Sequence, residues 1–331
     1  MNDRQATLGS RCHDADHQTE PVFSARDYIT GDGFVVARCS VCRLYVTEPA
    51  PSPEEIVRYY PRRYYGVGRR FASPVEWALD RLYSYRAARI VRGVAPGKVL
   101  DIGCGRGLLL NKLRQRGWEA VGTELSEDAA AYARHYLKLP VFTARLEEIG
   151  FRSGEFDLII LWHVLEHMHC PLAALSEVSR LLKPGGMLVL SVPNFGSWEA
   201  RWGRRHWFHL DVPRHLTHFT PRTLEGALRG VGLQVLRREW FAPEYSFFGF
   251  VQTVQNKLGL PHNLLYDLLR TRSAKLLDGS GRGSREVGRG QALLALATAV
   301  PLGLLSLLYV PAMALAGRGA ILTVYAVKRH L

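Results

Sequence analysis

Asp101-Ile102-Gly103-Cys104-Gly105-Arg106-Gly107 is the stretch that decides the fold of this sequence. It follows a short apolar run, Lys98-Val99-Leu100, and opens a helix expected over Leu108–Arg116. Glycines let a backbone turn sharply and approach a ligand closely, while the first amides of a helix face that ligand. The dinucleotide-binding spacing G-x-G-x-x-G needs a glycine at position 108, where this chain has leucine. The spacing here is G-x-G-x-G, preceded two residues earlier by an acid.

Strand-like and helix-like segments alternate regularly around this loop. A helix with apolar residues at helical spacing, Trp77–Ile90, precedes it. The segments expected after it are a strand at Glu119–Val121, a helix at Glu127–Tyr136, strands at Val141–Phe142 and Phe156–Trp162, a helix at Leu172–Leu182, a strand at Met187–Val192, a helix at Arg222–Gly230 and a strand at Leu233–Phe241. Such alternation is typical of an α/β fold with a mostly parallel sheet and helices on both faces. Ligands of such sheets bind outside the carboxyl ends of the strands.

The glycine spacing resembles the first motif, D-x-G-x-G-x-G, of the class I S-adenosylmethionine (SAM)-dependent methyltransferases. The resemblance covers roughly residues 74–241. Gly154-Glu155-Phe156-Asp157 is similar to the family's F-D segment, and Leu181-Leu182-Lys183-Pro184-Gly185-Gly186 is similar to its L-K-P-G-G turn. The resemblance implies a Rossmann-like, seven-stranded sheet and an enzyme that uses SAM as its methyl donor.

The resemblance also implies which residues contact SAM. Asp101 would lie near the methionine amino group, and Glu124, at the end of the second strand, would accept both ribose hydroxyls. The family often has an acid after the third strand to recognise adenine, but this chain reads Thr143-Ala144-Arg145-Leu146, so backbone amides near Leu146 are expected there. For Asp101 or Glu124 alone, helix capping is the alternative. The predicted SAM-binding residues are Asp101, Gly103, Cys104, Gly105, Gly107, Glu124, Leu125, Leu146, Trp162 and His163.

His163-Val164-Leu165-Glu166-His167 matches the inverted zinc-protease pattern H-x-x-E-H. A protease would need both histidines on one helix face, whereas this segment directly follows a buried strand. It resembles the V-L-E-H segment of quinone-biosynthesis O-methyltransferases. If the methyl acceptor is a hydroxyl, a base must take its proton, and histidine suits neutral pH. The candidates are His163, His167 and the histidine-rich loop Trp207–His218, all expected at the carboxyl ends of strands four and five. Of these, His167 and His215 are the predicted base or substrate contacts; the alternative is that each caps a helix or satisfies a buried carbonyl.

The N-terminal cysteines suggest a metal site. Cys39-Ser40-Val41-Cys42 is half of a tetrahedral zinc site, and Cys12 would supply the third ligand. The fourth could come from His13, Asp14, Asp16 or His17, of which His17 is preferred. Ala15 stands where a second C-x-x-C pair would need its second cysteine, so a degenerate ribbon without metal is the alternative. The five cysteines are an odd number, and the first 30 residues have no apolar signal segment, which predicts a reducing, cytoplasmic compartment.

An apolar run without any charged residue, Ala292–Gly317, is long enough to span a bilayer. Pro301 and Pro311 are expected to break a straight helix. The segment Ala320–Val327 reads as a last strand that returns to the sheet, so both ends of the run would lie on one side of a membrane, as a re-entrant hairpin or interfacial helices. A soluble lid or a dimer interface is the alternative. The preceding basic residues, suited to anionic headgroups, are Arg270, Arg272, Lys275, Arg282, Arg285 and Arg289.

The expected organisation has four parts: a zinc-ribbon-like module (1–65), the methyltransferase domain (66–241), an apolar helical insertion (242–317) and the last strand (318–331). With a net charge of +13, an anionic partner is one interpretation and solvation by arginine the other. The prediction is O-methylation of a small-molecule, lipid-linked or glycan acceptor by a cytoplasmic enzyme attached peripherally or re-entrantly to the membrane. The alternatives are an RNA or protein methyltransferase and a non-catalytic SAM-binding or zinc scaffold. The N/D-P-P-Y segment of nucleobase amino methyltransferases is missing after strand four, which disfavours nucleic acid.

Overall fold

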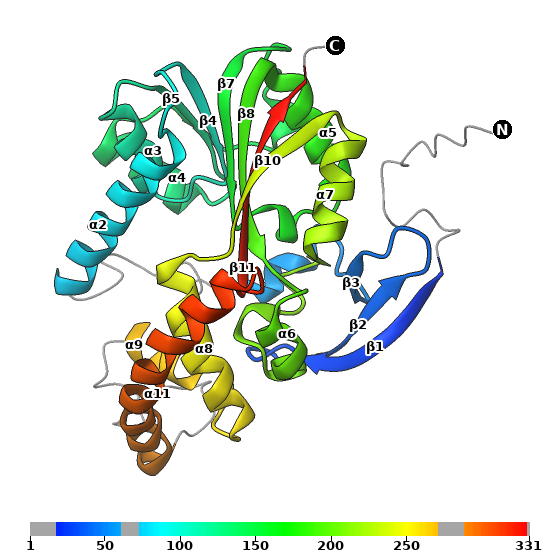
Figure 1. The fold of residues 1–331 in the computed structure, drawn as a ribbon, viewed down its shortest axis with the longest axis vertical. Coiled ribbons are helices and arrows are strands. Elements are labelled where there is room, and N and C mark those ends of the chain that lie inside the picture. The colour runs from blue at the N-terminus through cyan, green and yellow to red at the C-terminus, as the bar shows by residue number, and fades with distance from the viewer. Residues whose placement is uncertain (1–17, 61–72, 271–287, 330–331) are drawn as a thin grey trace.

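The computed structural model describes residues 18–60, 73–270 and 288–329. Its centre is a seven-stranded sheet with helices on both faces (Figure 1). Across the sheet the strands are β10 (Leu233–Glu239), β11 (Ile321–Lys328), β8 (Leu182–Pro193), β7 (Phe156–Trp162), β4 (Lys98–Ile102), β5 (Glu119–Thr123) and β6 (Val141–Phe142). The strands from β8 to β6 run parallel, and β11 is antiparallel to both of its neighbours. The predicted Rossmann-like α/β fold is thereby confirmed.

Alternating side chains of β7 divide the core into two layers. Leu158 and Ile160 pack under α2 (Ser73–Ile90), α3 (Leu108–Arg114) and α4 (Glu127–Leu137). Ile159 and Leu161 pack on the other face, under α5 (Pro171–Leu181) and α7 (Pro221–Gly230). All four side chains are fully buried, and each contributes about 1.5–3 kcal/mol relative to an exposed one. A strand buried on both faces has a continuous apolar sequence, which is why this strand was predictable.

The N-terminal residues form a second, antiparallel sheet. Its strands are β1 (Thr19–Arg26), β2 (Gly33–Cys39), β3 (Tyr45–Glu48) and β9 (Thr217–His218), in that order. The fourth strand belongs to the segment that follows β8 in the methyltransferase half of the chain, so the two parts share a sheet (Figure 1). The short helices are η1 (Ile56–Tyr59), η2 (Leu146–Glu148), η3 (Leu165–His167), α6 (Trp198–Gly203), η4 (Arg204–His206) and η5 (Phe208–Leu210).

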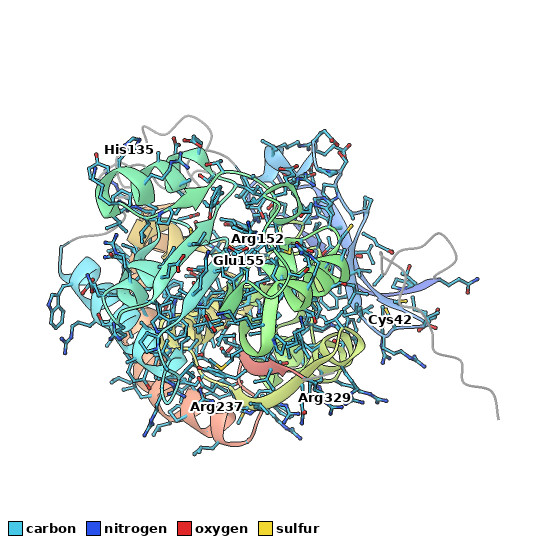
Figure 2. All side chains as sticks on the ribbon, turned by 90° about the horizontal axis from the view of Figure 1, so that it is seen from above. Cys42, His135, Arg152, Glu155, Arg237 and Arg329 are labelled. Carbon is cyan, nitrogen blue, oxygen red and sulfur yellow. The ribbon has the colours of Figure 1, made fainter. Side chains whose placement is uncertain are left out.

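Two of the four predicted zinc ligands lie in this N-terminal sheet. Cys39 ends β2 and is fully buried, and Cys42 lies in the turn that follows it (Figure 2). The other two, Cys12 and His17, lie outside the described residues. The zinc site therefore stays a prediction.

In the described part of the chain, three helices lie between β10 and β11: α8 (Pro243–Lys257), α9 (Leu264–Arg270) and α11 (Arg289–Leu315). They extend away from the sheet as one bundle (Figure 1). The expectation that Pro301 and Pro311 break the apolar run is wrong, because α11 is continuous through both. Both prolines lie on the exposed side of α11, so the missing N–H donors leave the face that packs on α8 intact.

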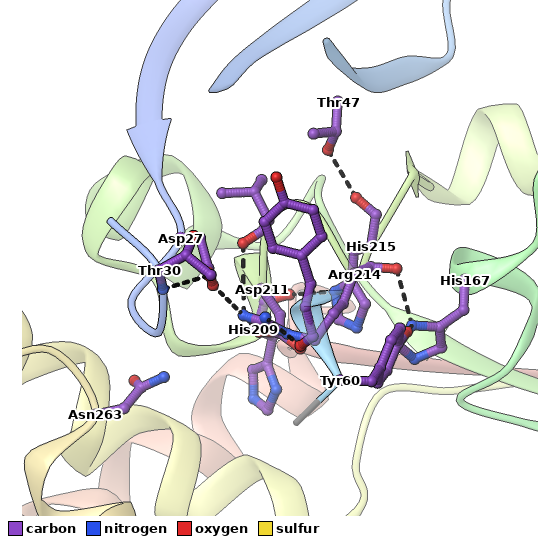
Figure 3. A network of polar contacts seen from close by, with 12 residues as sticks. Asp27, Thr30, Thr47, Tyr60, His167, His209, Asp211, Arg214, His215 and Asn263 are labelled. Atoms are coloured by element: carbon purple, nitrogen blue, oxygen red, sulfur yellow. Dashed lines mark hydrogen bonds and ion pairs between the residues drawn. The ribbon is translucent and has the colours of Figure 1, made fainter. Parts of the chain in front are cut away.

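A buried arginine joins the two parts of the chain (Figure 3). The Arg214 guanidinium is fully buried and binds Asp27 Oδ1 at 2.8 Å and Asp211 Oδ1 at 2.7 Å. It also donates to the main-chain oxygen of Tyr59 at 3.0 Å. Burial by itself would raise the pKa of Asp211, but the Arg214 charge outweighs it and lowers that pKa to about 2. The ion pairs therefore hold β1, η1 and the segment before β9 together.

We expect Arg214→Met to destabilise the protein by about 3–5 kcal/mol, because it leaves two buried carboxylates without their cation. Urea unfolding followed by circular dichroism measures this. The matched control is Arg58→Met, which removes an exposed ion pair with Asp32 and should leave the urea midpoint unchanged. Equal midpoints for the two variants would contradict the role given to Arg214.

Candidate functional site

The glycine loop connects β4 to α3 in a conformation that requires glycine. Gly103, Gly105 and Gly107 have φ angles of 68°, 54° and 72°, in the left-handed region. A Cβ at Gly103 would lie 2.5 Å from Val164 Cγ2, whereas a Cβ at Gly105 would meet nothing within 4 Å. At Gly103 the loop thus packs against the residues that follow β7, and at Gly105 it faces open space.

Glu124, at the end of β5, holds this loop in place. Its Oε2 accepts a hydrogen bond from the Gly105 amide at 2.8 Å, and its Oε1 accepts one from the Ser126 amide at 2.8 Å. Each carboxylate oxygen keeps a further lone pair, so the same group can also accept hydroxyls. The predicted ribose contact and a structural clamp are therefore compatible.

Asp101 is a strand residue and not a loop residue as predicted, because β4 continues to Ile102. Its side chain is buried, and burial raises its pKa to about 7, with the nearby Arg86 charge acting in the opposite direction and Glu124 adding to the rise. This carboxyl group therefore titrates near neutral pH and gains from any cation placed beside it.

Arg86 is a site residue that the sequence analysis missed. It lies on α2 with its side chain 10% exposed, its guanidinium 4.1 Å from the centroid of the Trp162 ring. It forms an ion pair with Glu244 in the first turn of α8. Its neighbour Ala87 is fully buried, so helical spacing places position 86 at the packed face. The sequence alone gives no signal for this position, because the burial of Ala87 and the partners of Arg86 are known only from the structure.

A small cleft opens beside Arg86. Its walls come from α2, from the ends of β7 and β10, and from the start of α8. The charged and aromatic lining residues are Tyr85, Arg86, Arg89, Trp162, Glu239, Phe241, Glu244 and Tyr325. The cleft lies at the carboxyl end of β7, where ligands of such sheets bind.

His163 and Glu166 form a pair directly after β7. The Nδ1 of His163 lies 3.1 Å from Glu166 Oε1, and both side chains are largely buried. Burial would raise the pKa of Glu166, but the hydrogen bond with His163 and the charges of the surrounding histidines lower it to about 2. The carboxylate is therefore ionised and accepts the Nδ1 proton of His163.

The predicted histidines His167 and His215 lie together, with ring centroids 4.6 Å apart. His167 Nδ1 lies 2.9 Å from the main-chain oxygen of Arg214 and 3.0 Å from Tyr60 Oη (Figure 3). His215 Nδ1 lies 2.9 Å from the main-chain oxygen of His209. Burial, with repulsion from His167, lowers the pKa of His215 to about 4, so this ring is neutral at pH 7.

Glu166, His167 and His215 each place a ligand atom within 4.8 Å of the others. Both imidazoles already donate Nδ1–H to main-chain oxygens, and the carboxylate already binds His163. These contacts occupy Nδ1 of each imidazole and Oε1 of the carboxylate, and Glu166 Oε2 is buried without a hydrogen-bond partner among the described residues; we assign no metal to the three residues.

The remaining predicted SAM contacts differ in exposure. Leu125 is 69% exposed beyond the end of β5, while the Leu146 side chain in η2 is buried in the core. Cys104 and Trp162 are partly buried, and burial raises the pKa of the Cys104 thiol. With a protonated thiol, Cys104 acts as a packing group of the loop.

Comparison with known proteins agrees with this geometry. A family model described as a methyltransferase domain matches residues 74–238. The ubiquinone biosynthesis O-methyltransferase of Aromatoleum aromaticum is 35% identical over 108 residues, 31% of this chain and 46% of that protein. The enzyme of the same name from Pseudomonas aeruginosa is 39% identical over 111 residues, 31% of this chain and 47% of that protein. The crystal structure of the 4+2 cyclase SpnF superimposes with a TM-score of 0.51 at 19% identity, over 85% of this chain and 97% of that one.

The likeness to the cyclase shows the fold alone. The chain spans about half the length of the curated relatives it matches. Through residues 74–238 the chain belongs to the class I SAM-dependent methyltransferases, as a distant relative of the ubiquinone biosynthesis O-methyltransferases.

Proposed function

We propose that this protein transfers the methyl group of SAM to a hydroxyl of a lipid-linked or cell-envelope acceptor, and that its helical bundle attaches it to the cytoplasmic face of the membrane. The observation that carries the proposal is the outward-facing apolar surface of α11, joined to a domain of the SAM-dependent methyltransferase family.

The residues around the glycine loop fit SAM. Gly103 and Gly105 have no side chains that would block the approach of a ligand to the loop backbone. Glu124 offers a carboxylate for the ribose, and Asp101 offers a buried one for the methionine ammonium. SAM supplies an activated methyl group, so the protein has to position the acceptor in line with it and exclude water.

Helix α11 is long and apolar enough to cross a membrane, the one such helix among the described residues. Its most apolar 18-residue stretch has a mean hydropathy of 2.2, yet only 17% of that stretch is buried. The core helix of a soluble protein would be mostly buried, so this helix offers its surface to another apolar phase. Its strongly exposed apolar residues are Leu293, Leu294, Leu296, Val300, Leu304, Leu305, Leu307, Leu308 and Leu315.

The side chains of α11 are distributed in the reverse of the pattern expected for a helix of a water-soluble bundle. The four buried residues of α11 are Ala292, Ala295, Ser306 and Val310, whereas its leucines are mostly exposed. On α8 the buried Gln255 donates through Nε2 to Ala295 O at 2.8 Å and to Thr298 Oγ1 at 3.0 Å. Small residues and internal hydrogen bonds join helices in lipid, where leucine faces outward. This inversion supports a lipid surface as the partner of α11.

The topology supports attachment from one side. Helix α8 leaves the sheet after β10, and α11 returns to it at β11, so the bundle begins and ends at the same domain. Near its base, α6 exposes Trp198 and Trp202 to 48% and 41%. Arg201 and Arg318 lie over the first ring and Lys257 over the second. Tryptophan with basic neighbours is typical of the membrane–water interface.

The net charge of +13 keeps an RNA or protein acceptor as the second candidate. We place it second because the leucine surface of α11 has no role in binding a polar macromolecule. A non-catalytic SAM-binding protein would bind SAM without transferring its methyl group.

The proposal predicts that labelled methyl from SAM enters a membrane extract and partitions into the organic phase. Glu124→Ala should lose at least about tenfold in SAM affinity, the value of a lost hydrogen bond to a charged group, and the signal should fall with it. Scintillation counting of the two phases measures the transfer. Label confined to the aqueous phase would exclude the lipid acceptor and point to glycan, RNA or protein.

Leu304→Glu combined with Leu308→Glu should abolish co-sedimentation with phosphatidylglycerol vesicles. Both side chains already face outward, so the melting temperature should stay unchanged. Leu236→Glu on β10, 62% exposed against 63% for Leu304, is the matched control and should bind vesicles like the wild type. Unchanged vesicle binding together with a change from dimer to monomer would show that α11 contacts a second copy.

SAM affinity should fall as the pH drops below about 7, by up to about tenfold per unit. The pKa of Asp101 in the folded protein is raised to about 7, and the ammonium of SAM favours its ionised form, so binding at lower pH must release a proton. Calorimetric titration between pH 5.5 and 7.5 measures this slope. Asp101→Asn should bind SAM more weakly, and its affinity should not change with pH over this range. The same pH dependence in that variant would show that Asp101 is not the group that titrates.

A further inference from the structure

His163 has a nitrogen that nothing in the described part of the chain uses. Its Nδ1 is held by Glu166, while its Nε2 is buried and has no hydrogen-bond partner. An ionised Glu166 accepts the Nδ1 proton, so the lone pair of the imidazole is on Nε2. A buried lone pair without a donor costs free energy in the folded protein unless a ligand supplies the donor.

The backbone of His163 is also strained. Its φ is 56°, in the left-handed region, which is unfavourable for a residue other than glycine. Its amide donates to Ser191 O on β8 at 2.9 Å, so the strained conformation is held by the neighbouring strand. Strain that the surrounding structure maintains is common at active sites.

His163 lies next to the glycine loop that is proposed to bind SAM. Val164, the following residue, packs against Gly103, and Trp162, the preceding residue, lies under Arg86 in the wall of the cleft. The ring of Tyr245, from the first turns of α8, has its centroid 4.3 Å from that of His163. His163 thus lies between the glycine loop and the first turns of α8.

The other histidines nearby are less suited to act as a base. His209 also has an Nε2 without a hydrogen-bond partner in the part of the chain that the structure describes, but this atom packs against Gly249 of α8. The contact is so close that a Cβ added at Gly249 would lie 2.2 Å from Nε2, so no acceptor hydroxyl fits between them. Burial lowers the pKa of His209 to about 3 and that of His215 to about 4, so both are weak proton acceptors.

We propose that His163 is the base that takes the proton from the acceptor hydroxyl during methyl transfer. This rests on the proposed function. A lone pair of the hydroxyl oxygen forms the new O–C bond to the methyl group, and the C–S bond breaks with its electron pair going to sulfur. The hydroxyl proton moves to Nε2, and the imidazolium, stabilised by the Glu166 carboxylate, later releases it to water. The products are the methyl ether, S-adenosylhomocysteine and one proton.

The decisive variant is His163→Asn, because asparagine tolerates the left-handed conformation and has no basic nitrogen. It should keep the melting temperature of the wild type, and kcat should fall about 100- to 10,000-fold, far more than the affinity for SAM falls. His135→Asn, an exposed histidine on α4 (Figure 2), is the matched control and should transfer methyl like the wild type. The acceptor is the membrane-extract fraction that the wild type labels.

A second variant separates a proton-accepting role from a structural one. In His163→Gly, added imidazole should restore part of the lost kcat, with a dependence on imidazole concentration that wild type and His135→Asn do not show. A structural role would give no such rescue.

Methyl transfer by His163→Asn at the wild-type rate would overturn the assignment. So would wild-type activity that disappears after treatment with EDTA and returns with Mg²⁺, since a cation at Glu166, His167 and His215 would then activate the hydroxyl. Failure of the proposed function looks different: the wild type would bind SAM and label no fraction, and both proposals would fall together.

Discussion

The guanidinium of Arg214 lies fully buried between Asp27, just after β1, and Asp211, in the segment that leads to β9. A charge at such a depth is tolerated only while its partners stay in place. The main-chain oxygen of the same residue also accepts a hydrogen bond from His167. Arg214 therefore links the N-terminal sheet, the segment that leads to β9 and the turn after β7, in addition to the pairing of β3 with β9. The site has its shape only while both parts of the chain are assembled.

Much of the methyltransferase domain could be predicted because its signals are local. The glycine spacing of Gly103 to Gly107 requires left-handed backbone, and the apolar run of β7 requires burial on both faces. Arg86 and β9 could not be predicted in this way. The role of a polar residue on the packed face of a helix cannot be predicted until its partner is known. A two-residue strand is too short to show an alternating pattern of apolar residues. The continuity of α11 was missed because the two prolines were judged without knowing that they lie on its exposed side.

The hydrogen bonds of the histidines could not be predicted from the sequence either. The sequence indicates that His163, His167 and His215 gather at the carboxyl ends of neighbouring strands. It does not indicate that Nδ1 of His167 and of His215 bond to main-chain oxygens at positions 214 and 209. Those contacts join residues from separate segments or within an irregular loop, so no periodicity encodes them. Which nitrogen remains available to a substrate is therefore a property of the assembled fold.

Helix α8 belongs to the site and to the apolar bundle at once. Its first turns provide Glu244 to Arg86 and Tyr245 to the ring of His163, and further along Gln255 bonds to α11. A displacement of the bundle would therefore move the wall of the cleft, because a helix transmits motion along its axis with little bending. If lipid covers the leucines of α11, the bilayer fixes the position of α8, and through it the distance between the SAM loop and an acceptor that arrives from the membrane. Attachment and catalysis would then depend on the same helix.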